Sequence, residues 1–427
     1  MKTSRTILLT GGLVAASIWT GTGSATAGPA SPASTASPPR TSTVAPAAPL
    51  ATPGAAYLDG VYCTGRSNCW AVGVQPRGTA TVNQMLHWNG KTWRHFPVPN
   101  PGGTGGGADS ELAAVRCSTA RDCWAVGHYR ARGAKLNQML HWNGRAWFAM
   151  RTPQPAGTGQ TAANELTDVT CISARNCWAT GFSGKLSSPE LNEVLHWNGK
   201  SWSRPRVPEP GGLTNNSING LGSVRCPSAT RCLAVGSYST GPAKTFNEAL
   251  TWAGHSWVRQ RVPDPSSGLT LHGDELFGLG CGAPTSCFAV GISAFVGGKY
   301  LSQAMHWNGR AWSRTFPPQP AGSGPGDVNV LYFVTCTSAR SCWAVGSYGK
   351  NGATEFMRNQ ALRWNGRHWL LVHTPNPASA PDSDTDGLFS VRCTSASNCW
   401  AVGAQEHGNN VHNEILHWNG KRWSVWT

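Results

Sequence analysis

The chain has 427 residues, of which 35 are Lys or Arg and 20 are Asp or Glu, so its formal net charge at pH 7 is +15. No stretch of the sequence is long and apolar enough to span a bilayer permanently, which excludes a helical membrane protein. A surplus of cations favours encounters with anionic partners such as envelope polymers, acidic polysaccharides or extracellular nucleic acid.

The N-terminus has the pattern of an export signal followed by a tether. Lys2 and Arg5 precede an uncharged stretch with an apolar centre, and Ala25-Thr26-Ala27 forms a small-x-small cleavage site. We expect residues 1–27 to be removed after Ala27, which predicts a secreted, extracellular protein. Residues 28–56 are almost wholly Ala, Pro, Ser, Thr and Gly and cannot bury enough apolar surface to fold, so they are expected to form a disordered tether.

The rest of the chain, residues 57–427, is a repeat marked by cysteines. All 14 cysteines fall in pairs six residues apart, and successive pairs begin 54 to 57 residues apart. The pairs are Cys63 and Cys69, Cys117 and Cys123, Cys171 and Cys177, Cys226 and Cys232, Cys281 and Cys287, Cys336 and Cys342, and Cys393 and Cys399. Seven copies of one unit of about 54 residues therefore fill this region.

Each unit predicts four short strands, called a to d, in two hairpins. In the second copy, LAAVRC and CWAVGHY are rich in strand-forming residues and flank a short turn, and LNQMLHW and RAWFAM flank Asn143-Gly144. Seven such units without helical periodicity predict an all-β protein, a seven-bladed β-propeller of four-stranded antiparallel blades. If strand a lines the axis, the first and last blades pack face to face; if the CWAVG strand lines it, the blades are permuted and one blade is shared by both termini.

The cysteines and tryptophans have structural interpretations. Five residues between paired cysteines do not match the spacing of zinc ligands, and the expected compartment is oxidising, so we predict one disulfide across the a–b hairpin of each blade. Tryptophan flanks the Asn-Gly-type turn on both sides in all seven copies, as at Trp142 and Trp147. Rings required by every blade are expected to pack between blades rather than to bind a ligand.

The repeat signature carries a resemblance. The C-x5-C-W-A-V-G and L-H-W-N-G-x-x-W motifs resemble those of secreted propeller proteins from actinobacteria, the high-GC Gram-positive bacteria, over about 370 residues. A weaker similarity is to kelch and Asp-box propellers, although a single glycine such as Gly127 stands where kelch repeats have a pair. The resemblance implies a secreted propeller and no particular activity.

Two polar positions recur in strand c. Histidine occupies one of them in five copies, at His87, His141, His196, His306 and His417. Strand c lies about 10 Å outside the innermost strand, so these side chains are too far apart to share a metal and are expected to be structural. The repeated Asn83, Asn137, Asn192, Asn247, Asn359 and Asn413 are expected to bond local backbone, with seven separate sugar sites, one per blade, as the alternative.

The charges divide between the two faces of the predicted disc. The a–b and c–d turns share one face, called the turn face, which carries Lys91, Arg145, Lys200, Arg310, Arg367 and Lys421 together with Arg66, Arg121, Arg175, Arg231 and Arg340. The b–c and d–a loops share the other face, called the long-loop face, where variable loops favour binding. Acids gather there at the start of strand a, around the expected channel mouth, at Asp59, Asp109, Glu111, Glu165, Asp168, Asp274, Glu275, Asp327, Asp382, Asp384 and Asp386.

These features predict a binding protein that recognises a carbohydrate or cell-envelope polymer through the long-loop face. The predicted ligand-binding residues at the channel mouth are Asp109, Glu111, Glu165, Asp168, Asp274, Glu275, Asp327, Asp384 and Asp386, with Ca²⁺ as the candidate cofactor. The alternatives are a glycan lyase or hydrolase that uses these carboxylates as acid and base, and an extracellular scaffold for a protein partner. We expect a monomer, and no nucleic acid ligand because the tryptophans are needed for packing.

Overall fold

The computed structural model describes residues 56–186, 188–241, 244–267, 272–350, 357–377, 384–407 and 410–426, and the predicted signal and tether lie outside this part of the chain. The described residues form 28 strands and no helix, so none of them forms a helix that could cross a membrane. Four consecutive strands pair antiparallel in each repeat, which confirms the all-β, seven-bladed propeller.

The strands follow the same order in every blade. The first, strand a, is β1 (Tyr57–Gly65), β5 (Ser110–Thr119), β9 (Ala162–Ser173), β13 (Ile218–Ser228), β17 (His272–Ala283), β21 (Val328–Ser338) and β25 (Asp384–Ser395). Strand b is β2 (Asn68–Arg77), β6 (Asp122–Ala131), β10 (Asn176–Lys185), β14 (Arg231–Ser239), β18 (Ser286–Phe295), β22 (Ser341–Gly349) and β26 (Asn398–His407). Strand c is β3 (Ala80–Trp88), β7 (Ala134–Trp142), β11 (Leu191–Trp197), β15 (Lys244–Trp252), β19 (Lys299–Trp307), β23 (Arg358–Trp364) and β27 (Asn410–Trp418). Strand d is β4 (Trp93–His95), β8 (Trp147–Ala149), β12 (Trp202–Ser203), β16 (Trp257–Arg259), β20 (Trp312–Thr315), β24 (Trp369–Leu371) and β28 (Trp423–Val425).

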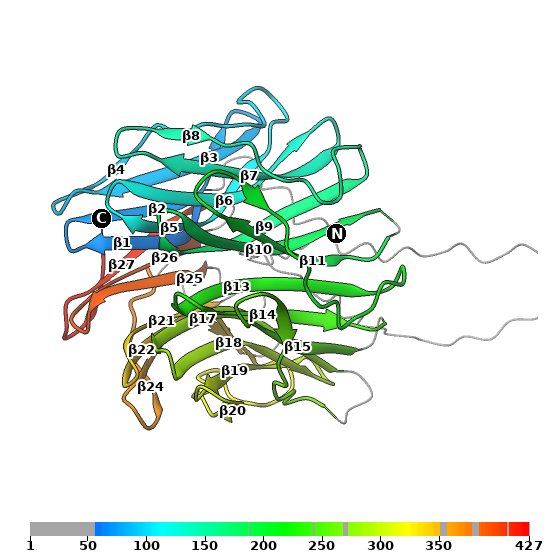
Figure 1. The fold of residues 1–427 in the computed structure, drawn as a ribbon. Coiled ribbons are helices and arrows are strands. Elements are labelled where there is room, and N and C mark those ends of the chain that lie inside the picture. The colour runs from blue at the N-terminus through cyan, green and yellow to red at the C-terminus, as the bar shows by residue number, and fades with distance from the viewer. Residues whose placement is uncertain are drawn as a thin grey trace, which may run out of the picture.

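Strand a is the innermost strand of every blade. Each of these strands packs against the first strand of both neighbouring blades, and β1 packs against β25, so the ring closes. The closing blades share no strand, because β1 to β4 form one sheet and β25 to β28 form another. In Figure 1 the last strands, β26 and β27, lie beside β1 and β2. The unpermuted alternative from the sequence is therefore the one adopted.

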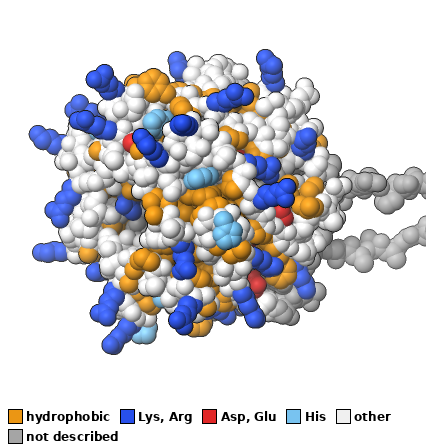
Figure 2. Space-filling view, in the orientation of Figure 1, with side chains coloured by type: hydrophobic (Ala, Val, Ile, Leu, Met, Phe, Trp, Pro, Cys, Tyr) orange, Lys and Arg blue, Asp and Glu red, His pale blue; other side chains and the backbone are white. Residues whose placement is uncertain are grey.

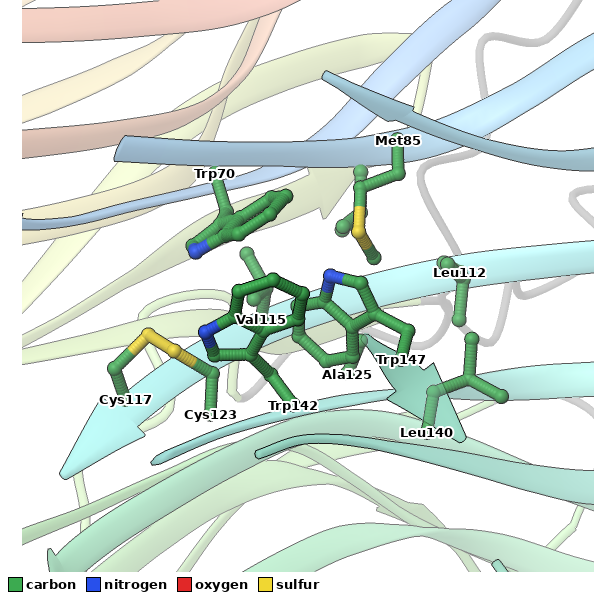
Figure 3. Packing of buried hydrophobic residues seen from close by; sticks show 11 residues of the cluster. Trp70, Met85, Leu112, Val115, Cys117, Cys123, Ala125, Leu140, Trp142 and Trp147 are labelled. Atoms are coloured by element: carbon green, nitrogen blue, oxygen red, sulfur yellow. A yellow bond between two sulfur atoms is a disulfide. The ribbon is translucent and has the colours of Figure 1, made fainter. Parts of the chain in front are cut away.

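Tryptophans fill the space between neighbouring blades. The ring of Trp70 lies 5.1 Å from that of Trp142 and 5.4 Å from that of Trp147, both in the next blade. Figure 3 shows these three rings with Leu112 and the Cys117–Cys123 bond in one buried cluster. The same contact closes the ring, since Trp88 of the first blade lies 4.8 Å from Trp400 of the last. The predicted packing role of the tryptophans is confirmed.

The disulfides and the recurrent polar residues also have the predicted structural roles. All seven cysteine pairs are bonded across their hairpins. His87 lies over Trp70 at 4.3 Å, and its Nε2 lies 2.6 Å from Asn68 Oδ1. Asn83 donates to the Pro99 carbonyl at 2.8 Å and, beyond the prediction, to Gln138 of the next blade at 3.0 Å.

Glycine in the CWAVG motif makes room for a bulge in strand a. A Cβ on Gly127 would lie 2.0 Å from the Glu111 carbonyl oxygen, so no other residue fits. The register there passes from Leu112 to Ala114 and leaves Ala113 unpaired. Every blade has this bulge, and the extra residue turns toward the axis. The seven extra residues are Asp59, Ala113, Thr167, Gly222, Phe277, Tyr332 and Phe389.

Candidate functional site

The axis of the propeller contains a small cavity lined by all seven inner strands. Its volume is about 60 Å³, and the seven bulged residues all contribute to its wall. Most of them are apolar or uncharged, and Asp59 is the exception. Burial in this environment raises the pKa of Asp59 well above its usual value, and Glu111 and Glu165 raise it further. The axial cavity therefore holds an acid that favours its neutral form.

Carboxylates from neighbouring blades gather on the axis side of β1, β5 and β9. Glu111 accepts a bond from the Tyr57 hydroxyl at 3.4 Å, and Glu165 accepts one from Lys135 Nζ at 2.5 Å. Both acids are buried, at 8% and 4% exposure. The two carboxylates and Asp59 are close enough to influence one another's ionisation. The structure thus brings together the predicted Glu111 and Glu165.

The two glutamates differ in charge state. Burial and the nearby Glu165 raise the pKa of Glu111 to about 8. Burial also acts to raise the pKa of Glu165, but Lys135 and His128 outweigh it and hold that pKa below the usual value. At neutral pH Glu111 is mainly protonated and Glu165 is a carboxylate. A protonated acid beside an ionised one is the arrangement that acid–base catalysis uses.

Sequence reasoning missed three members of this cluster. Burial and Lys135 lower the pKa of His128 to about 4, so it is neutral at physiological pH. Burial and Glu165 raise the pKa of Glu190 to about 8. The register offers a signal for His128, which faces Glu111 across the a–b hairpin. No comparable signal exists for Lys135 and Glu190, because strand c and the b–c loop reach this region only through the packing of neighbouring blades.

Four of the other predicted site residues lie on the long-loop side and support local structure. Asp109 pairs with Arg130 at 2.9 Å. Asp274 accepts bonds from the backbone and hydroxyl of Ser266 in the preceding loop. Asp327 accepts the Gly324 amide at 2.8 Å. Asp384 lies 2.9 Å from His407 Nδ1.

The remaining three lie on the inner strands. Glu275 is buried in β17, where it raises the pKa of Tyr300 in addition to the effect of burial. Asp386 is buried in β25 and raises the pKa of Glu414, again in addition to burial. Asp168 lies further along β9, where its Oδ2 is 2.6 Å from Arg225 Nη1. Asp382 lies outside the described residues.

The exposed charges of the described residues are all cations, whereas the acids are buried or partly buried. Glu355 and Asp382 lie outside the described residues, and none of the other 18 acidic side chains is exposed. In contrast, many Lys and Arg side chains lie on the surface shown in Figure 2, where few acidic side chains are visible. All eleven cations predicted on the turn face are exposed.

The long-loop face is also basic, which differs from the acidic mouth expected there. Its exposed charges are cations at or beside the ends of strands b and c, namely Arg77, Arg132, Lys185, Lys244, Lys350 and Arg358. The acids of this face lie beneath the surface because strand a is covered by the loops and by its neighbours. Among the described residues, no group of three His, Cys, Asp or Glu side chains is arranged to hold a metal ion.

Comparison with known proteins shows the fold. A GH74 xyloglucanase from Xanthomonas campestris is similar at TM-score 0.52 and 14% identity over 88% of this chain and 55% of that one. An acylaminoacyl peptidase from Pyrococcus horikoshii is similar at TM-score 0.50 and 7% identity over 87% of this chain and 52% of that one. The WD40 β-propeller domain of Doa1 is similar at TM-score 0.44 and 11% identity over 87% of this chain and 93% of that one.

The matched region is about half the length of the xyloglucanase and of the peptidase, and at these identities the likeness concerns the propeller alone. No protein-family model matches the chain, and no curated protein sequence matches it.

Proposed function

We propose that this protein is a secreted binding protein that holds an anionic carbohydrate or cell-envelope polymer on its long-loop face. One observation carries the proposal: every exposed charge among the described residues is a cation, and each acid among them is buried or partly buried. A surface of one sign raises the local concentration of oppositely charged chains and speeds their capture. Seven disulfides fit a protein that works in an oxidising compartment, where such polymers occur.

The long-loop face is favoured over the turn face because its cations stand on loops of different length and sequence. The turn face repeats the same two short turns, a–b and c–d, in each of the seven blades, which offers charge without variety. On the long-loop face, Arg77, Lys185, Lys244 and Lys350 lie in four different blades, at the ends of b–c connections that differ from one another. Specific recognition needs such differences, since binding residues are usually carried by loops on a rigid scaffold.

Two charge-neutralised variants test the choice of face. The first replaces Arg77, Lys185, Lys244 and Lys350 with Gln, and the second replaces Lys91, Lys200, Arg310 and Arg367, so that both lose four exposed cations. Binding of residues 28–427 to a polyglycerol phosphate, an acidic polysaccharide and a neutral glucan is then measured by surface plasmon resonance. We expect the first variant to lose affinity for the anionic polymers by about tenfold or more, because it removes several charge contacts.

The second variant should bind within about threefold of the unchanged protein, because long-range attraction alone is weakened by salt. The choice of face would be contradicted if both variants lost the same affinity for the anionic polymers, or if the first variant kept its affinity. Tight binding to the neutral glucan would contradict the charge-based account. Preference for single-stranded nucleic acid over both anionic polymers would assign the surface to another class of ligand.

The opposite charge states of Glu111 and Glu165 favour one second candidate, a glycan lyase or hydrolase. The two acids lie on neighbouring inner strands, and Lys135 keeps only Glu165 ionised. In that case E111Q and E165Q would each abolish release of soluble product from a bound polymer without reducing its retention. Absence of product from every bound polymer between pH 5 and 9 would exclude this activity.

A further inference from the structure

Three arginines meet on the axis near the a–b turns. Arg116, Arg225 and Arg392 each immediately precede the first cysteine of their blade. The guanidinium of Arg116 lies 5.1 Å from the ring centre of Tyr62 and 5.5 Å from that of Phe333. Arg392 lies 4.4 Å from the Tyr62 ring, and Arg225 lies 5.2 Å from the Phe333 ring. Tyr62 and Phe333 belong to the first and sixth blades, so these contacts coexist only at the centre of the ring.

The positive charge at this point is only partly neutralised. Asp168 accepts a bond from Arg225 at 2.6 Å, and its Oδ2 also accepts the Ser223 hydroxyl at 2.5 Å. Asp59, the other acid that lines the axial cavity, has no hydrogen-bond partner on either oxygen. Burial raises the pKa of Asp59 well above its usual value, which favours its neutral form. Three guanidinium groups therefore face one carboxylate.

Guanidinium nitrogens at this point also lack acceptors. Nη2 of Arg225 and Nε of Arg392 are buried without a hydrogen-bond partner. Arg116 is only 7% exposed and lines the axial cavity of about 60 Å³, and its guanidinium donates no hydrogen bond to the described part of the chain. A buried donor without a partner costs about 1–3 kcal/mol and more when charged. Aromatic rings attract the cations but do not accept bonds along the edge of the guanidinium plane.

We propose that this end of the channel binds a tetrahedral oxyanion of the phosphate class, held by Arg116, Arg225 and Arg392. The planar fork of arginine matches the spacing of phosphate oxygens, and the stacked rings fix the direction of each fork. A dianion would neutralise the two positive charges that Asp168 leaves. The axial cavity, whose wall includes Arg116, is several times larger than the roughly 10–15 Å³ that one water needs, so a small oxyanion can enter beside Arg116. The ligand is the free ion or a phosphate-ester end group.

Thermal unfolding of residues 28–427 tests the site, with sodium phosphate compared with sodium chloride at the same ionic strength and pH. Phosphate should raise the melting temperature where chloride does not, because a ligand of the folded state stabilises it. R116Q and R392Q should each weaken the apparent affinity about tenfold or more, since each removes a charged bond to the anion. The matched control is R66Q/R121Q, which removes two exposed arginines from the a–b turns and should keep the full shift.

The melting temperatures of the variants are also measured in chloride without phosphate. R116Q should melt at or above the temperature of the unchanged protein in chloride, because it removes one of three like charges. Equal shifts in phosphate and chloride, or loss of the phosphate shift in R66Q/R121Q, would overturn the proposal. In a crystal soaked with selenate, an anomalous peak within hydrogen-bond distance of Arg116 and Arg392 would support it, and an empty channel would contradict it.

Two phosphate compounds distinguish the source of the ligand. A shift with inorganic phosphate alone supports the site for the free ion, and an equal shift with glycerol phosphate supports it for an ester end group. If neither compound raises the melting temperature, the site is contradicted for the free ion and for the ester. The long-loop variant in which Arg77, Lys185, Lys244 and Lys350 become Gln should keep the phosphate shift. The axial site and the proposed polymer surface can therefore fail independently.

Discussion

At one position of strand c, some blades carry glutamine and the others carry a glutamate that must form the same hydrogen bonds. Gln138 accepts a bond from Asn83 with its Oε1 and donates with its Nε2 to the carbonyls of Glu111 and His128, at 2.6 and 2.7 Å. Glu193 takes this position in the next blade. Its Oε1 accepts from Asn137 at 2.6 Å, whereas its Oε2 is buried without a partner as an acceptor.

A protonated carboxyl resolves this arrangement, because its hydroxyl can donate where the amide does in other blades. Burial raises the pKa of Glu193, Glu248 and Glu414 well above the usual value. The three acids therefore hold their blades together as neutral groups. From the sequence they look like ordinary charged residues, and nothing in a single repeat reveals that the position is buried.

Replacing these three acids with Gln should stabilise the protein at pH 8. The folded pKa lies above the unfolded one, so the acids contribute stability that is complete below about pH 4.5 and is lost as the pH rises through the folded pKa. E193Q/E248Q/E414Q should raise the melting temperature at pH 8 and change it little at pH 4. The gain should be about 1 kcal/mol or more per site, the size of a buried unmade bond.

The reverse substitution is the control for this prediction. Q138E should leave the melting temperature at pH 4 nearly unchanged and lower it at pH 8. Thermal unfolding followed by near-UV circular dichroism at pH 4 and pH 8 measures the melting temperatures of Q138E and of the triple Gln variant. A triple Gln variant that is less stable at pH 8 than the unchanged protein would show that the acids are not acting as neutral donors.

At the scale of elements, the ring closes through packing and hydrogen bonds between the first and last blades, without a shared strand. The Val61 amide of β1 bonds the Ser390 hydroxyl of β25 at 3.3 Å, and the Ala56 amide bonds the Val411 carbonyl of β27 at 3.0 Å. Trp426, just after the last strand, lies 4.9 Å from Trp88 of the first blade and 5.3 Å from Trp400. It stands where Phe96 stands in the first blade, which packs on Trp142 of the next blade at 5.3 Å. One ring thus joins the C-terminal end of the chain to its first blade.

W426A should destabilise the closure more than an equivalent change elsewhere. Trp426 is 36% exposed, so we expect a loss of about 1–3 kcal/mol, below the 3–5 kcal/mol of a fully buried ring. The matched control is Q260A, at the same repeat position in the fourth blade, where the backbone amide bonds the Ala249 carbonyl in the same way. Urea unfolding measures both. An effect of W426A no larger than that of Q260A would mean that Trp426 does not hold the ring closed.

The strands and the disulfides could be predicted because their signals are local and are repeated seven times. The spacing of Cys117 and Cys123 and the Asn143-Gly144 turn define hairpins within one blade.

The carboxylate site could be predicted only in part, because the bulge in strand a reverses which residues face the axis. Glu111 and Asp168 are both on strand a, yet one lies beside Tyr57 and the other beside Arg225. Burial, which decides their charge, comes from packing between blades.

At the scale of the whole molecule, the charges are arranged in two shells. The inner shell holds the buried acids, several of them neutral or paired, and the outer shell holds exposed lysines and arginines. The formal net charge of +15 counts every acid as ionised, so it understates the positive charge wherever burial keeps an acid such as Glu193 protonated. Among the described residues, every charged side chain that is exposed to an approaching ligand is a cation.

Binding of residues 28–427 to a series of polymers that differ in charge density, measured at two salt concentrations, tests this account most directly. The series should contain a neutral glucan, a polymer with one carboxylate per disaccharide, and a polyglycerol phosphate. We predict that affinity rises with charge density and falls at least tenfold between 50 and 300 mM NaCl, because screening weakens each contact. Affinity that is independent of charge density and salt would contradict the claim that the cationic exterior is the binding surface.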